Sequence, residues 1–147
     1  LYTMSPIDRD PRGRVVAVAY LGLVTWESLL ESERADTKEA WWAPASRLPH
    51  LAYDHDEVME IARKRLRSRM TYTTLMRALM PKEFTLPELE TAYAVVLGSP
   101  VDRRNFRKKL AKLKLLEELP RKRKGGRHRP AALYRFRGKS IAEIEVL

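Results

Sequence analysis

Residues 101–139 read VDRRNFRKKLAKLKLLEELPRKRKGGRHRPAALYRFRGK and contain sixteen Lys or Arg but only three Asp or Glu. In the first part of this segment, Phe106, Leu110 and Leu113 recur at the i, i+4, i+7 spacing of an amphipathic helix. Asp102 precedes them and can accept hydrogen bonds from the first free backbone N–H groups of such a helix. The sequence therefore predicts a helix that begins after Asp102 and packs one face against a core.

The other face of this predicted helix is cationic. At about 100° per residue, four basic residues lie opposite the apolar stripe: Arg104, Arg107, Lys108 and Lys112. Like charges on one face repel one another, so the face costs stability unless a polyanion neutralises it. The pattern favours nucleic-acid binding, and a solvated charged surface is the alternative.

The residues after this helix predict a β-hairpin. A short apolar run, Leu115–Leu119, is followed by the basic segment Arg121–Arg129 and by the alternating sequence LYRFR at 133–137. Gly125-Gly126 supplies the positive φ angles that a tight hairpin tip needs, and six Lys or Arg surround it. A basic helix followed by a basic hairpin is typical of a winged-helix module, in which the helix enters the major groove and the hairpin contacts phosphates or the adjacent minor groove.

The residues before the basic helix predict the first helix of a helix-turn-helix. Thr85 and Glu88 have the spacing of a capping box, and Gly98 is suited to end the helix Leu86–Leu97. Phe84-Thr85 predicts a short strand before it. The residues expected to be buried on this helix are Leu89, Ala92, Tyr93 and Val96.

A longer connecting helix, His55–Arg69, is predicted further upstream. Asp54 and Glu57 form a capping-box-like pair at its start. Capping explains these acids better than a metal site, because consecutive residues at a helix start point in different directions. A short helix, Tyr72–Met80, follows and ends at Pro81. The expected buried face of the long helix consists of Val58, Ile61, Ala62, Arg65 and Leu66.

The N-terminal third contains the apolar run VVAVAYLGLV at Val15–Val24, after an irregular stretch at 1–14. This run predicts a strand buried on both faces, which needs neighbouring strands on either side. The sequence AWWA at 40–43 predicts a second, short strand, and Ser46–Leu48 predicts a one-turn helix after a turn at Pro44. Residues 1–53 are therefore interpreted as part of a larger domain.

Composition bounds the class of protein. Residues 1–52 carry six Lys or Arg and seven Asp or Glu, so the net charge of +10 lies in the later part of the 147 residues. The sequence has no cysteine, which excludes disulfides and thiolate metal sites and is compatible with a reducing cytosol. The apolar run is shorter than the roughly 20 residues of a membrane helix. We expect a cytoplasmic protein without a membrane partner.

The order of these segments resembles the Nudix-related transcription regulators of the NrtR type. The resemblance rests on RDPRGRVVAVAYLGLV at 9–24, LPHLAYDHDEVMEIARKRLR at 48–67 and EFTLPELETAYAVVLGSPVDRRNFRKKLAKLKLLEEL at 83–119, and it covers nearly the whole chain. It implies an α+β fold with three parts. These are the C-terminal part of a Nudix-like effector domain at 1–53, a connecting helix at 54–70 and a winged helix-turn-helix DNA-binding domain at 71–147.

The resemblance also implies a function. Regulators of this type bind double-stranded DNA as homodimers, so the expected partner is a palindromic operator. They respond to ADP-ribose or a related nucleotide and commonly repress genes of NAD metabolism. An ADP-ribose-type nucleotide is therefore the expected effector, and no resident cofactor or metal is expected. The protein would act in the bacterial cytoplasm, associated with the nucleoid when bound to DNA.

The family's Nudix signature, a Gly followed by a Glu-rich helix with an Arg-Glu-x-x-Glu-Glu core, should lie before Leu1, and the 147 residues contain nothing like it. Its glutamates hold the divalent metal in catalytic relatives, so the chain is not expected to be an enzyme. We interpret the chain as a fragment that begins after that helix. The alternatives are a Nudix pyrophosphohydrolase with a basic C-terminal extension and a nucleic-acid binder without sequence preference.

Two groups of candidate binding residues follow. Arg104 and Arg107 are expected to read bases, because an Arg fork matches the two acceptors of guanine. The full set of expected DNA-binding residues is Arg103, Arg104, Arg107, Lys108, Lys112, Arg121, Lys122, Arg123, Lys124, Arg127 and Arg129.

Candidates for effector binding lie in the N-terminal part. A pyrophosphate could be held there by bidentate bonds from Arg9, Arg12 and Arg14, with Trp42 stacking on an adenine. Solvated turn residues and core packing are the alternative roles. No catalytic and no metal-binding residue is expected.

Overall fold

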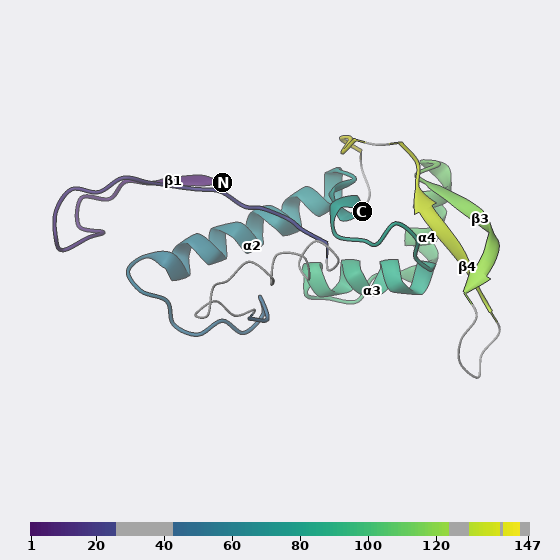
Figure 1. Ribbon diagram of the computed structural model, residues 1–147, viewed down its shortest axis with the longest axis horizontal. Helices are drawn as coiled ribbons and strands as arrows, with labels where there is room; N and C mark the ends of the chain where they lie inside the picture. Colours follow the sequence, from purple (N-terminus) through teal and green to yellow (C-terminus); the bar gives the residue numbers. More distant parts are fainter. Residues whose placement is uncertain (26–42, 124–129, 139, 145–147) are drawn as a thin grey trace, which may run out of the picture.

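The computed structural model describes residues 1–25, 43–123, 130–138 and 140–144, and these form an α+β fold. In Figure 1 β1 is drawn above α2 in the left half of the view, the long helix α2 runs along the molecule, and α3, α4, β3 and β4 gather at the other end. The elements in chain order are β1 (Tyr2–Met4), β2 (Ala17–Ala19), α2 (His55–Tyr72), the 3-10 helix η1 (Leu75–Ala78), α3 (Leu86–Leu97), α4 (Arg103–Lys112), β3 (Leu116–Arg123) and β4 (Ala131–Phe136).

The helix-turn-helix of α3 and α4 forms where the caps predict it. Thr85 Oγ1 accepts a hydrogen bond from the Glu88 backbone N–H, and Glu88 Oε2 accepts one from the Thr85 N–H at 2.8 Å, which completes the capping box. Gly98 ends α3 with a φ of 74°, a left-handed conformation that favours glycine. Asp102 then caps α4 by accepting from the Asn105 N–H at 3.1 Å. These predictions are confirmed.

One apolar core joins the two helices, the end of α2 and the hairpin. The Tyr93 ring of α3 meets Phe106 of α4 edge to face at 4.8 Å, and the Phe84 ring lies 5.1 Å from Phe136 of β4. As predicted, Leu89 and Tyr93 are buried, and Ala92 and Val96 pack against the core. Leu113 was expected in the buried stripe of α4 but is only half-buried. The buried core consists of Met70, Met76, Met80, Phe84, Leu89, Tyr93, Phe106 and Leu110.

The predicted hairpin is present as β3 and β4, which pair antiparallel from Leu116–Phe136 to Arg123–Ala131. The register shifts between Glu118 and Lys122. Pro120 lies in this interval and has no N–H to donate to the ladder. Phe84 bridges to Tyr134 through two backbone hydrogen bonds of 3.0 and 2.7 Å. The predicted short strand Phe84-Thr85 is thus reduced to a single bridge at Phe84. The predicted tip at Gly125-Gly126 lies outside the described residues.

The connecting helix differs from its prediction in three ways. It runs on to Tyr72, its residue Arg65 is exposed and not part of a buried face, and Asp54 makes no side-chain cap bond. Both Asp54 carboxylate oxygens instead accept from Arg9, at 2.7 and 2.8 Å, which leaves neither free for the helix N–H groups. Arg65 could not be buried because an unpaired guanidinium has no compensation inside an apolar core.

The predicted helix Tyr72–Met80 is wrong: only Leu75–Ala78 is helical, as a 3-10 turn. Thr73 is extended, with a φ of −139°, and its hydroxyl donates to the Arg69 carbonyl at 2.7 Å, which ends α2 at this point. The C-terminal segment pairs with the residues between α2 and η1. Thr74 N–H donates to the Ala142 carbonyl at 2.9 Å and Ile144 N–H to the Tyr72 carbonyl at 2.7 Å, a pairing that the sequence did not reveal.

The predicted strand Val15–Val24 is also wrong in length and burial. Only Ala17–Ala19 is a strand, and it pairs with Tyr2–Met4, which the sequence analysis had taken as irregular. Val16, Val18 and Tyr20 are 55, 58 and 86% exposed. A doubly buried strand needs neighbours on both sides, and the described residues supply one, over three residue pairs.

Two smaller predictions also concern this part of the chain. Residues 45 and 46 form a turn, with the Arg47 N–H donating to the Pro44 carbonyl, so the one-turn helix Ser46–Leu48 is not formed. The predicted strand at 40–43 falls mainly outside the described residues. Among the helices of the described ranges, none is both long and apolar enough to cross a membrane.

Candidate nucleic-acid interface

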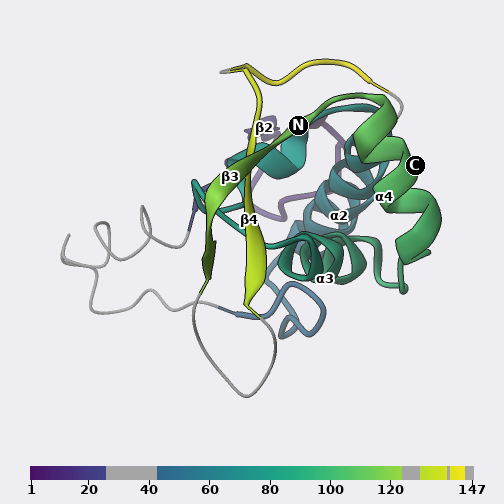
Figure 2. The ribbon, with the colours of Figure 1, turned by 90° about the vertical axis from the view of Figure 1, so that its right-hand side faces the viewer.

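The exposed face of α4 carries unpaired positive charge. Arg104, Lys108 and Lys112 are exposed, and within the described ranges none of them has a carboxylate partner. Figure 2 views this end of the molecule and shows α4 on its right and the β3–β4 hairpin on its left. The capped start of α4 and its buried Phe106 and Leu110 fix which side of the helix turns outward. The helix therefore presents exposed cationic side chains on the side opposite its buried residues.

Two other arginines of α4 contact a carboxylate of α3. Arg107 Nε donates to Glu90 Oε1 at 2.5 Å, and Arg103 Nε lies 3.6 Å from Glu90 Oε2. The Glu90 side chain is 7% exposed, whereas those of Arg103 and Arg107 are 81 and 47% exposed. The hydrogen bond to Glu90 raises the pKa of Arg107 above its ordinary value. Sequence reasoning expected both arginines to be free and overlooked Glu90.

A signal for Glu90 was nevertheless present in the sequence. Glu90 follows buried Leu89 and precedes buried Tyr93 by three positions, so it flanks the apolar stripe of α3. A flanking position on one helix of a helix-turn-helix faces the next helix, and α4 is rich in cations. A carboxylate at such a place is a candidate for an ion pair between the helices.

The hairpin arginines are also paired within the chain. Arg121 contacts the Glu83 carboxylate and Arg123 contacts that of Glu88, which also completes the capping box of α3. Lys122, between them, is exposed and has no carboxylate partner in the described ranges. The remaining predicted hairpin contacts, Lys124, Arg127 and Arg129, lie outside the described residues.

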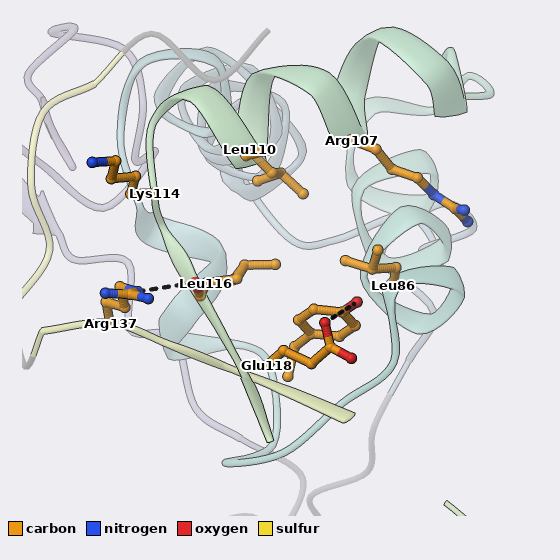
Figure 3. A pocket seen from close by; sticks show the side chains of 9 residues that line it. Leu86, Arg107, Leu110, Lys114, Leu116, Glu118 and Arg137 are labelled. Carbon is orange, nitrogen blue, oxygen red and sulfur yellow. Dashed lines mark hydrogen bonds between the residues drawn. The ribbon is translucent and has the colours of Figure 1, made fainter. Parts of the chain in front are cut away.

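A pocket of about 440 Å³ lies between α4 and the hairpin (Figure 3). Leu86, Leu110 and Leu116 supply its apolar surface. Figure 3 shows Lys114 and Arg137 together on one side, with Arg137 Nε donating to the Leu116 carbonyl at 3.0 Å, and the Arg107 guanidinium pointing away from the pocket. Neither Lys114 nor Arg137 was among the predicted contacts. Lys114 has a positive φ of 50°, uncommon for a residue other than glycine, at the turn from α4 into β3.

The predicted effector-binding residues have partners of their own. Arg9 donates hydrogen bonds to both carboxylate oxygens of Asp54, and the two side chains are largely buried, at 7 and 14% exposure. Arg12 binds Asp10, whose pKa this contact lowers to about 2. Arg14 is exposed, and Trp42 lies outside the described residues. The structure thus brings Arg9 and Arg12 to carboxylates within this chain, while their role in effector binding stays a prediction.

The acidic cluster at the start of α2 is divided among different partners. Asp54 binds Arg9, whereas Asp56 accepts from the Leu51 N–H at 3.0 Å and lies 2.5 Å from His50 Nδ1. These contacts lower the pKa of both aspartates, for Asp54 mainly through Arg9 and for Asp56 mainly through the Leu51 N–H. In the part of the chain that the structure describes, no three His, Cys, Asp or Glu side chains form a group that could hold a metal ion.

Comparison with known proteins agrees with this geometry. Residues 76–136 match the family described as the NrtR DNA-binding winged helix domain. A protein of Acinetobacter baylyi named ADPR responsive transcriptional repressor NtrR is 34% identical over 129 residues, which are 87% of this chain and 51% of that protein. The chain is similar to NrtR proteins. This confirms the resemblance and the α+β fold with a winged helix that the sequence implied.

Solved structures of an NrtR protein give the same fold. Shewanella oneidensis NrtR complexed with a 27mer DNA superposes with a TM-score of 0.76 at 33% identity, over 92% of this chain and 62% of that chain. A second structure of Shewanella oneidensis NrtR superposes with the same TM-score of 0.76 at 33% identity, over 93% of this chain and 62% of that chain. The NrtR-like chain spans about half the length of the Acinetobacter relative. The matched winged helix contains α3, α4, β3 and β4, and so every expected DNA contact, but not Arg9 or Arg12.

Proposed function

We propose that the NrtR-like chain is the DNA-binding part of a transcriptional repressor. The observation that carries this proposal is the exposed face of α4, where Arg104, Lys108 and Lys112 have no carboxylate partner in the described ranges. Such a face is stabilised when phosphates neutralise its mutually repelling positive charges. The Shewanella relative was crystallised with DNA and the Acinetobacter relative is named a repressor, which supports the same role here.

The proposed arrangement places α4 in the major groove, which is about 12 Å wide in B-DNA. Arg104 is exposed and unpaired, so its guanidinium is free to donate to the two acceptors of a guanine. Lys108, Lys112 and Lys122 would contact phosphates, which position the protein without reading sequence. The hairpin arginines would exchange Glu83 and Glu88 for phosphate oxygens, because those carboxylates are partly exposed, at 34 and 43%.

The partner would be a palindromic operator bound by a homodimer. One winged helix reads only a few base pairs, so two copies are needed for selectivity. Selection from a pool of random double-stranded DNA by the full-length protein is expected to enrich two inverted half-sites separated by about 34 to 36 Å or a multiple of it. Sequencing of the enriched pool measures this. Recovery of duplexes without any shared sequence would contradict a sequence-specific repressor and favour a general nucleic-acid binder.

The proposed effector is ADP-ribose or a related nucleotide, and the regulated genes would be those of NAD metabolism. The Acinetobacter relative is named ADPR responsive, and the present chain covers 51% of it. Arg9 and Arg12 are engaged by Asp54 and Asp10, so a nucleotide would have to compete with these carboxylates. The 147 residues contain no Arg-Glu-x-x-Glu-Glu motif. We propose that the nucleotide acts as an effector and not as a substrate, in a cytoplasmic protein without a resident cofactor.

ADP-ribose is expected to weaken operator binding by the intact protein, but not by the 147-residue chain. An effector shifts binding only by its differential affinity for the free and DNA-bound arrangements, and the chain alone is expected to lack half of the nucleotide site. Titration of ADP-ribose into labelled operator complexes of both proteins measures the release. Equal release from the two would show that residues 1–147 hold the whole sensor.

A further inference from the structure

We propose that Glu90 is a positioning residue for DNA recognition: it directs the guanidinium groups of Arg107 and Arg103 and thereby contributes to sequence selectivity. This inference rests on the proposed DNA-binding function. Glu90 lies on α3, the helix that supports α4, and only 7% of its side chain is exposed. It is therefore not placed to contact DNA itself, and it acts through the two arginines.

The atoms that meet decide what this contact does. Arg107 donates to Glu90 from Nε, the inner nitrogen of its guanidinium, at 2.5 Å, and the nearest contact of Arg103 is also through Nε. In the described ranges no other hydrogen bond engages the Arg107 side chain, so its two outer NH2 groups stay available. In Figure 3 this guanidinium points away from the pocket beside the hairpin. A hydrogen bond through Nε orients the plane of the Arg107 guanidinium and leaves its outer edge, the two NH2 groups, free to donate.

A fixed outer edge matters because guanine is read by a bidentate contact. The O6 and N7 acceptors of guanine match the fork geometry of an arginine, and an oriented side chain loses less rotamer freedom when it binds. Burial keeps Glu90 in place, since a carboxylate removed from water is retained only with charged partners. The inference is that the Glu90 contact persists in the DNA complex while Arg107 presents its outer edge.

The hairpin provides a contrast on the same surface. Glu83 also pairs with an arginine, Arg121, but its side chain is 34% exposed, about five times the exposure of Glu90. An exposed carboxylate is hydrated and easily exchanged for a phosphate oxygen, so Glu83 does not hold a direction during binding. Glu83→Gln and Glu90→Gln each remove one negative charge beside the same cationic surface. They differ in whether an arginine loses its orientation.

The test compares Glu90→Met, Glu90→Gln and Glu83→Gln with the wild-type chain. Met has the shape of Glu without its acceptors, whereas Gln keeps one acceptor and loses the charge. Fluorescence anisotropy at one salt concentration measures the dissociation constants for a scrambled duplex and for a duplex selected by the wild type. The ratio of the first constant to the second expresses the sequence selectivity. Circular dichroism and thermal unfolding of each variant verify that it folds.

Glu83→Gln is expected to tighten binding to both duplexes by the same factor and to leave the ratio unchanged. Glu90→Met is expected to lower the ratio by about five- to 150-fold, the discrimination that a bidentate contact supplies. Glu90→Gln should lie between Glu90→Met and the wild type, and it decides the question by itself if Glu90→Met does not fold. In an Arg103→Ala, Arg107→Ala background, Glu90→Gln should no longer change the ratio.

An unchanged ratio in Glu90→Gln and Glu90→Met, with tighter binding to both duplexes as in Glu83→Gln, would show that Glu90 acts only through its charge and would overturn the inference alone. A persistent effect of Glu90→Gln without the two arginines would also overturn it. A wild-type chain that binds both duplexes equally, or neither, would overturn the proposed function and this inference together.

Discussion

Binding of the chain to duplex DNA should weaken by about 10³- to 10⁵-fold when salt rises from about 50 to about 200 mM, the loss expected for about six to ten phosphate contacts. The cations that the structure leaves without a carboxylate partner in the described ranges include Arg104, Lys108, Lys112 and Lys122. Further contacts come from the hairpin once Arg121 and Arg123 exchange their carboxylates. Anisotropy titrations of a labelled duplex at several salt concentrations measure the slope of log K against log salt.

Variants assign this slope to the α4 face. Replacing Lys108 and Lys112 together by Ala should reduce the slope by about 1.8, at about 0.9 for each lost phosphate contact. Lys64→Ala is the control, because it removes an exposed charge, 3.7 Å from the Glu60 carboxylate, from α2, away from α4 and the hairpin. Arg104→Ala should in addition relax sequence preference. A flat salt response of the wild type, or an equal change of slope in Lys64→Ala, would contradict the proposed interface.

Phe84→Ala is expected to cost about 3 to 5 kcal/mol of unfolding free energy, the range for a fully buried phenylalanine. Phe84 is 0% exposed, and its ring contacts Phe136 of the hairpin while its backbone pairs with Tyr134. Loss of the ring therefore loosens the hairpin from the helical core. Because domains are stable by only about 5 to 15 kcal/mol, this one change removes a large share of the total.

Urea denaturation followed by circular dichroism measures the change in unfolding free energy. Val95→Ala on α3 is the control, because Val95 is 74% exposed and its truncation should change stability by no more than about 0.5 kcal/mol. DNA binding by Phe84→Ala should also weaken at temperatures where the variant is partly unfolded. Equal stability of the two variants would show that the Phe84–Phe136 contact does not hold the hairpin to the core.

The helix-turn-helix and the hairpin could be predicted from the sequence because their signals are local. The Thr85–Glu88 capping box, the left-handed Gly98 and the Asp102 cap each depend on residues within about four positions, and all three form as predicted. The apolar spacing on α3 and α4 likewise decides which side of each helix is buried before any partner is known. The exposed positions of Arg104, Lys108 and Lys112 on α4 follow directly from that spacing.

Only the tertiary structure decided how the charges are paired and whether an apolar strand is covered. The contacts of Arg9 with Asp54, Arg107 with Glu90 and Arg121 with Glu83 join residues 45, 17 and 38 positions apart, distances over which local periodicity carries no information. The apolar run at 15–24 likewise predicted burial, but burial depends on neighbouring strands, and β1 is the one that the described residues supply. Local spacing determines which side chains are available, whereas packing between elements determines which of them meet.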